Sequence, residues 1–231
     1  ASGHAPQAAG ATSPMPPMDH SGNLDGMQNR GFMARFTTAT GYVATGLLAF
    51  TLLIGPANLL LRRQNPVSSY LRRDVGMWTA IVSVVHVIAG LQVHGPPGPL
   101  DTRILRYFFA PDGSPLLDAF GLGNWTGLAA TVIVVGLLAI SSDVALRKLK
   151  AGPWKWLQRL NYALFALVVA HAMYYAAFGG ALLRITSPST LLLGPSVVAV
   201  FVGQTVGVWL WRRRYVRTTG RRYARATAQP A

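Results

Sequence analysis

Five long apolar segments dominate the pattern of hydrophobic and polar positions along the chain. They cover residues 41–61, 75–94, 125–142, 160–178 and 191–211. An α-helix rises about 1.5 Å per residue, so about 20 residues cross the hydrocarbon core of a bilayer. Each segment is close to that length. The pattern therefore predicts an all-α integral membrane protein, a bundle of about five transmembrane helices.

The flanking segments divide the chain into three parts. Residues 1–38 are rich in Ala, Gly, Ser, Pro and Met without hydrophobic periodicity, which predicts a flexible external tail. Residues 39–211 form the transmembrane domain, and residues 212–231 form a basic cytoplasmic tail. The longest connection, residues 95–124, begins with a Pro- and Gly-rich stretch and is expected to cap the outer face of the bundle.

Basic residues are concentrated in alternate loops. The chain has 21 Lys and Arg against seven acidic residues, for a net charge of +14. Most basic residues follow the first, third or fifth segment, whereas only Arg30, Arg35, Arg103, Arg106 and Arg184 lie on the other side. The positive-inside rule then places the N-terminus outside and the C-terminus in the cytoplasm. The expected location is the inner membrane of a bacterium. The charge indicates topology and contact with anionic lipid, and no nucleic-acid partner.

Two histidines are the candidate functional residues. His86 lies 11 residues after Val75 and His171 lies 11 residues after Leu160, so each is roughly 16 Å into its span. A titratable ring at that depth is costly unless it has a partner. A lone buried histidine is usually hydrogen-bonded to Ser, Thr or a backbone carbonyl. Here two histidines lie at equal depth on helices that the topology makes parallel. They instead predict a haem held between the second and fourth helices.

Ligation by two histidines leaves no open position on the iron, which suits electron transfer better than binding of a substrate at the metal. The chain has no cysteine and no glutamate. Disulfides, thiolate chemistry and cysteine-ligated iron–sulfur clusters are therefore excluded.

Motifs preceding both histidines resemble those of a known family. The stretch Arg72-Arg-Asp-Val-Gly-Met-Trp78 comes before His86, and Trp154-Lys-Trp-Leu-Gln-Arg-Leu-Asn-Tyr162 comes before His171. Both are similar to the signatures of the ferric reductase-like transmembrane superfamily. Its most similar branch is the bacterial one that contains the haem-binding membrane subunit of the periplasmic methionine sulfoxide reductase system.

The resemblance implies a membrane b-type cytochrome subunit, with one haem b whose iron is ligated by His86 and His171. It further implies electrons drawn from a cytoplasmic flavin reductase or from the quinone pool, with a quinone as a further bound cofactor in the second case. The electrons would be delivered to an external redox partner protein.

The chain departs from the family pattern at two places. A second histidine often stands 13 residues before the ligand in the later helix, and Gln158 is found there; Arg73 holds the corresponding place in the earlier helix. The expectation is therefore one haem. In addition, the bacterial branch has a further helix at the start, where this chain has a polar tail.

Other residues are weaker candidates for the site. Arg103, Arg106 and Arg184 lie on the outer side and could pair with haem propionates, because the guanidinium group favours bidentate contact with carboxylates. His94 lies eight residues beyond His86 and is interpreted as a residue at the membrane interface. The alternatives are that it accepts a proton beside a quinol or contacts the haem propionates.

Two other functions remain open from the sequence. The chain could be a metal reductase that passes electrons directly to Fe(III) or Cu(II), gathered by the Met and His residues of the N-terminal tail. It could also be a non-redox scaffold subunit of a larger complex, with both histidines merely hydrogen-bonded.

Overall fold

The computed structural model describes residues 21–61, 67–93, 104–179 and 188–227, and within them it is helical apart from loops and one β-bridge. Five helices are long and apolar enough to cross a membrane, which confirms the predicted fold class. They are α1 (Ser21–Leu60), α2 (Val67–Val93), α4 (Ala119–Ala139), α7 (Leu160–Phe178) and α8 (Pro188–Thr227). Two short helices, α5 (Asp143–Leu149) and α6 (Ala151–Leu157), connect α4 to α7.

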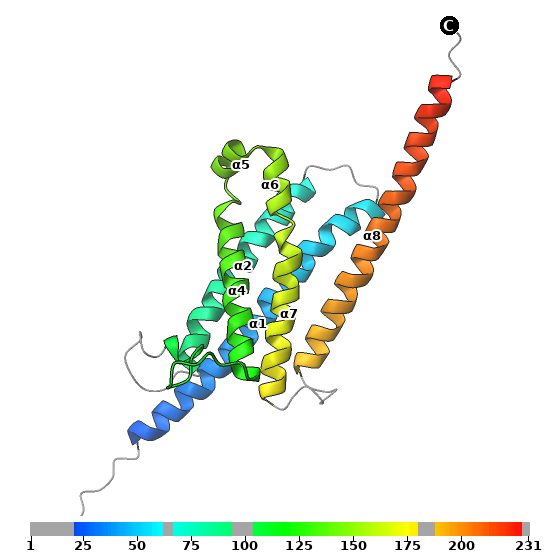
Figure 1. Ribbon diagram of the computed structural model, residues 1–231. Helices are drawn as coiled ribbons and strands as arrows, with labels where there is room; N and C mark the ends of the chain where they lie inside the picture. The colour runs from blue at the N-terminus through cyan, green and yellow to red at the C-terminus, as the bar shows by residue number, and fades with distance from the viewer. Residues whose placement is uncertain (1–20, 62–66, 94–103, 180–187, 228–231) are drawn as a thin grey trace, which may run out of the picture.

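The spanning helices alternate in direction along the chain (Figure 1). Helices α1, α4 and α8 run one way, and α2 and α7 run the other way. The main packing pairs are α1 with α2, α4 with α7, and α1 with α8. The parallel course of the second and fourth spans, on which the interpretation of the two histidines depends, is thus found in the structure. We call the end that carries α5 and α6 the basic end, because the basic loops lie there.

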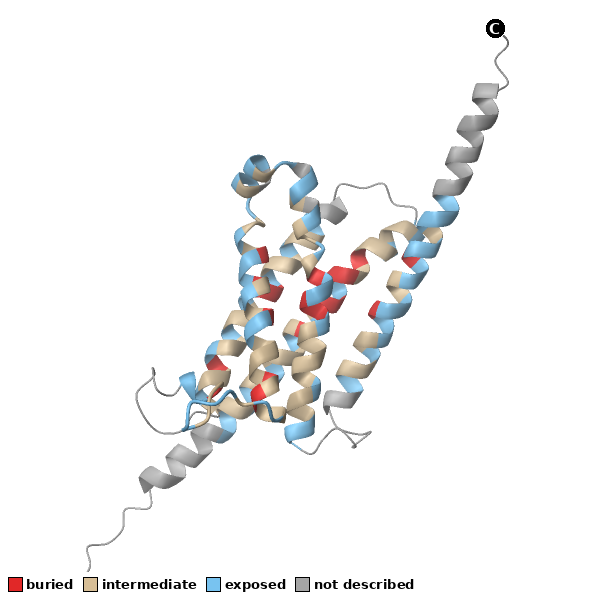
Figure 2. Cartoon of the chain, in the orientation of Figure 1, coloured by how far each residue is buried: buried red, intermediate tan, exposed pale blue. Residues whose placement is uncertain are grey.

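The buried core is small, as expected for a bundle surrounded by lipid (Figure 2). Its centre is formed by Leu48 and Leu52 of α1, Val134 of α4, Leu164 of α7 and Val200 of α8. Large apolar side chains on the outer faces remain exposed, such as Val132 at 65% and Phe201 at 73%. An apolar surface of this extent would be a liability in water. It is the surface that acyl chains cover in a membrane.

Helix α1 begins earlier than the composition suggests. It begins at Ser21, so residues 21–38 continue the first helix, where the sequence predicted a flexible tail. Extending an existing helix costs far less than nucleating a new one, because each added residue gains a hydrogen bond. A helix anchored by the apolar span can therefore continue through polar residues that show no periodicity. The first 20 residues of the predicted tail lie outside the described residues.

Helix α8 is fixed to α1 at a proline. Pro56 has no N–H, so the carbonyl oxygen of Leu52 loses its helical donor. The side chain of Gln204 on α8 supplies the missing hydrogen bond, with its Nε2 atom 2.7 Å from that oxygen. Gly207, one turn later, lets α8 approach closely, since a Cβ atom there would lie 3.2 Å from the Pro56 ring. Hydrogen bonds of this kind join helices where water is absent.

Replacing Gln204 with leucine should lower the stability of the bundle, because the Leu52 carbonyl would be left unpaired among apolar groups. We expect a loss of about 1 kcal/mol, which corresponds to a melting temperature about 2–4 °C lower. Thermal unfolding in detergent measures this. Thr205→Val is the matched control, because that hydroxyl is exposed and bonds only to Phe201 of its own helix. Equal effects of the two substitutions would contradict the assigned role of Gln204.

A short segment covers the end of the bundle opposite to the basic end. Tyr107 anchors it: the residue is 4% exposed, and its hydroxyl donates to the carbonyl oxygen of Leu91 at 3.1 Å. Asn124 of α4 donates in turn to the Tyr107 carbonyl at 3.1 Å. The described part of the predicted cap, from residue 104 onward, therefore packs against the ends of α2 and α4.

Candidate cofactor site

His86 projects from α2 against the backbone of α1. Its Nδ1 atom lies 2.8 Å from the carbonyl oxygen of Thr37. One turn further along α1 the imidazole ring packs against Gly41, where a Cβ atom would lie 2.9 Å from Cε1 of His86. Real Cβ atoms essentially never come so close, so only glycine leaves room for this ring.

His171 repeats this arrangement with the other helix pair. It projects from α7 against α4, and its Nδ1 atom lies 2.7 Å from the carbonyl oxygen of Gly123. One turn further along α4, a Cβ atom at Gly127 would lie 2.8 Å from that nitrogen. Each histidine is thus held by a backbone carbonyl and by a glycine four residues later on a neighbouring helix.

The two rings lie close together within the bundle. Their centroids are 6.1 Å apart and their planes are nearly perpendicular, at 84°. A metal–imidazole bond is about 2 Å long, and the ring centre lies about 1 Å behind the ligating nitrogen. Two imidazoles on opposite sides of one metal ion therefore need centroids about 6 Å apart. The observed spacing fits that requirement.

The hydrogen bonds determine which nitrogen is available. A carbonyl oxygen only accepts, so Nδ1 of each neutral ring carries the proton, and Nε2 keeps its lone pair. Histidines that bind metals commonly donate their other ring N–H in this way, which fixes the ring orientation. The hydrogen bond alone would also suit a purely structural histidine. What distinguishes this site is that two such rings lie opposite each other.

The protein groups alone would not complete a metal site. Among the described residues there is no group of three or more His, Cys, Asp or Glu side chains that could hold a metal ion. A metal bound here would have two protein ligands and would need its remaining ligands from elsewhere. A porphyrin supplies four ligands in one plane and leaves two axial positions. The residues present therefore fit a haem.

A second layer of contacts supports His171. The Tyr175 ring lies one turn further along α7, with its centroid 4.9 Å from that of His171. The Tyr175 hydroxyl donates to Oδ1 of Asn124 at 2.7 Å, and Asn124 also holds the Tyr107 carbonyl. This chain of contacts connects the capping segment to the helix that carries the histidine.

Of the remaining predicted site residues, the structure describes only Arg106. Arg106 is exposed in the turn before Tyr107. Arg103, Arg184 and His94 lie outside the described residues, as do the first histidines and methionines of the N-terminal tail. Pairing of the three arginines with propionates stays a prediction.

The chain is similar to known proteins over most of its spanning region. The family model described as "Ferric reductase like transmembrane component" matches residues 40–169, which is more than half of the chain; the match includes His86 and ends two residues before His171. The chain belongs to this family. A curated relative is the protein-methionine-sulfoxide reductase heme-binding subunit MsrQ of Ralstonia nicotianae, 26% identical over 180 residues, covering 76% of this chain and 71% of the relative. No solved structure matches.

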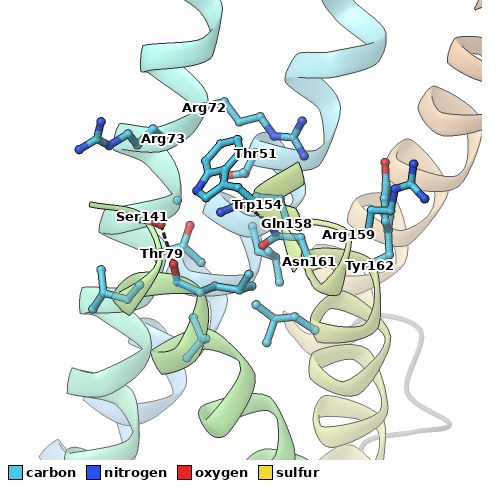
Figure 3. Close-up of a pocket in the computed structure, with 16 residues that line it drawn as sticks. Thr51, Arg72, Arg73, Thr79, Ser141, Trp154, Gln158, Arg159, Asn161 and Tyr162 are labelled. Carbon is cyan, nitrogen blue, oxygen red and sulfur yellow. Dashed lines mark hydrogen bonds between the residues drawn. The ribbon is translucent and has the colours of Figure 1, made fainter. Parts of the chain in front are cut away.

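A cavity of about 470 Å³ lies at the basic end of this ferric reductase-like bundle. It is lined by both residues that replace the second pair of histidines, Arg73 and Gln158 (Figure 3). Arg73 forms an ion pair with Asp143 at 2.5 Å. Oε1 of Gln158 accepts a hydrogen bond from Asn161 at 3.2 Å. Neither an arginine nor a glutamine is a haem ligand, so this cavity has no axial pair.

The groups that hold the rings were not predicted from the sequence. They are Thr37 and Gly41 on one side and Gly123 and Gly127 on the other. One signal was present: the bonded carbonyls precede their histidines by 49 and 48 residues, and each is followed four residues later by glycine. Small residues four apart on one helix indicate a place where another group approaches the backbone closely.

Proposed function

We propose that this protein is a membrane b-type cytochrome subunit that relays electrons, with one haem b held by His86 and His171. The observation that carries the proposal is the pair of imidazoles 6.1 Å apart, each with Nδ1 bonded to a backbone carbonyl. The name of the curated relative, a heme-binding subunit, supports the same cofactor. When bound, the haem supplies one-electron redox chemistry without an open iron position.

The chain's own residues give the cofactor a fixed and water-poor site. The carbonyls of Thr37 and Gly123 hold both rings in one orientation, with Nδ1 protonated, so Nε2 of each ring would be free to bind the haem iron. The apolar helix faces around the pair keep out water. A single haem is proposed because the other cavity offers only Arg73 and Gln158 at the corresponding places.

The proposed donor is a cytoplasmic flavin reductase or the quinone pool, and the proposed acceptor is an external redox partner protein such as a methionine sulfoxide reductase. The name of the relative supports that acceptor. The proposed location is the bacterial inner membrane. For direct reduction of Fe(III) or Cu(II), most of the Met and His residues of the tail that would gather the metal lie outside the described residues.

The basic end is proposed to face the cytoplasm, because positively charged loops are retained on that side. An impermeant thiol reagent applied to intact cells should label a cysteine introduced at Ser21 and leave one at Thr218 unlabelled. Both positions are polar in the native chain, so the substitutions disturb little. Labelling at Thr218 alone would contradict the orientation.

Electron relay is tested in liposomes that contain ferricyanide and carry the haem-loaded protein in their membrane. Dithionite added outside should reduce the trapped ferricyanide much faster than in liposomes without protein. His171→Ala should lower the rate to that of the empty liposomes, because one axial ligand is lost. An equal rate for His171→Ala and the native protein would mean that the haem pair does not carry the electrons.

A further inference from the structure

The cavity at the basic end is separate from the histidine pair and combines two kinds of lining. Its guanidinium groups belong to Arg72 and Arg73, near the start of α2, and to Arg159, just before α7. Its apolar groups, among them Leu48, Val134 and Leu164, lie further along α1, α4 and α7 towards the middle of the bundle. The cavity is thus cationic near the membrane boundary and apolar at greater depth.

The described residues balance only part of the positive charge of this cavity. No acidic residue lines it, and the chain contains no glutamate at all. Asp143 pairs with Arg73 from outside the lining, while Nε of Arg73 is buried without a partner. Within the part of the chain that the structure describes, Arg72 and Arg159 make no ion pair. Arg159 is exposed and Arg72 is half-buried, so both guanidinium groups are accessible to an anion at the edge of the cavity.

We propose that this cavity binds an anionic phospholipid, with the phosphate group at Arg72 and Arg159 and the apolar part against the deeper side chains. Guanidinium groups bind phosphate oxygens in a bidentate manner, and basic pockets between spanning helices at the cytoplasmic side suit such headgroups. Figure 3 shows Arg72 reaching from α2 over Thr51 of α1, across the cavity. A volume of about 470 Å³ is far larger than a phosphate ion needs.

The apolar depth of the cavity distinguishes a lipid from a soluble phosphate compound. A free phosphate ester would satisfy the arginines but would leave the leucine and valine surfaces open to water. An amphiphile satisfies both parts at once. The proposed lipid site lies at the basic end of the bundle and does not depend on haem at the histidine pair.

The test uses the full-length protein, purified with its haem, washed free of bound lipid in detergent, and then given one compound at a time. Phosphatidylglycerol should raise the melting temperature by about 5 °C at saturation, and native mass spectrometry should retain one molecule per chain. Phosphatidylcholine has no net charge and glycerol phosphate has no acyl chain. Neither compound should raise the melting temperature or stay bound in native mass spectrometry. A shift of the same size with glycerol phosphate would overturn the proposal in favour of a soluble ligand.

Charge-matched variants localise the binding. Arg72→Gln and Arg159→Gln should each weaken phosphatidylglycerol binding about tenfold, whereas Arg72→Lys should retain part of it. Arg147→Gln removes the same charge from the exposed surface of α5 and should bind as the native protein does. Equal weakening by Arg147→Gln would overturn the proposal, because it would reduce the effect to general surface charge. The haem spectrum recorded on each sample confirms that every variant is folded.

Discussion

Replacing either His86 or His171 with alanine is expected to abolish stable haem binding. Each ring is proposed to supply one of the two axial ligands, and the described residues offer no other imidazole near the pair. Loss of a residue that only supports a metal ligand commonly costs about 10–100-fold in affinity, and loss of the ligand itself should cost more. The purified variants should therefore lack most of the Soret absorbance per chain. Both should also melt at lower temperature, since bound cofactor stabilises the native state.

His94→Ala is the matched control, because it removes an imidazole only eight residues beyond His86. At about 1.5 Å per residue, His94 would lie about 12 Å further along the helix and could not replace His86. Its haem content and spectrum should stay close to those of the native protein. Loss of haem in His94→Ala together with retention in His171→Ala would show that the ligands have been assigned wrongly.

Placing a methyl group behind either ring should be almost as damaging as removing the ring. Gly41→Ala would put a Cβ atom 2.9 Å from Cε1 of His86, and Gly127→Ala would put one 2.8 Å from Nδ1 of His171. The ring would have to shift away from its carbonyl partner, and Nε2 would shift with it. We expect about 10–100-fold weaker haem binding, the range found when the support of a metal ligand is lost. Haem titration of the apoprotein measures this.

Gly46→Ala on α1 and Gly136→Ala on α4 are matched controls on the same two helices. Neither glycine has any atom within 4 Å of the added Cβ position. Alanine favours the helix over glycine by about 1 kcal/mol, so these variants should bind haem normally and should not melt earlier. If all four substitutions weakened haem binding equally, the effect would come from the helices in general and the close packing of the rings would not matter.

The spans and the histidine pair could be predicted from the sequence because the bilayer imposes a simple rule. Every backbone polar group in lipid must be satisfied within a helix, so length and hydropathy are enough to find the spans. Alternation of the basic loops then makes the second and fourth spans parallel. Equal depth along parallel helices places His86 opposite His171, and the structure brings their rings to 6.1 Å.

The groups that hold the rings depend on how each helix is rotated about its axis, and hydropathy does not determine that. Helices that are apolar on all sides show no face that must turn inward. The hydrogen bond from Gln204 to the Leu52 carbonyl joins residues 152 positions apart, so no local pattern could reveal it. Pro56 in the first span leaves the Leu52 carbonyl without a helical donor, and Gln204 in the last span is a polar side chain that can supply one.

The start of the first helix was predicted too late for a different reason. Composition and periodicity describe which residues prefer to be buried, whereas the extension of α1 back to Ser21 depends on a helix that already exists. The cavity at the basic end was also beyond the sequence, because its lining comes from α1, α2, α4, α6, α7 and the turns that follow α4 and precede α7. The sequence did show that Arg73 and Gln158 stand where a second pair of ligands would be.

That His86 and His171 are the two axial ligands of a single haem is tested most directly by the haem content and spectrum of the purified native protein. A pyridine haemochrome assay should give one haem b per chain, and the absorption spectrum should be that of six-coordinate, low-spin iron with two nitrogen ligands. Two haems per chain would mean that the cavity lined by Arg73 and Gln158 holds a second cofactor. Absence of haem, or a spectrum with an open iron position, would contradict the proposed site.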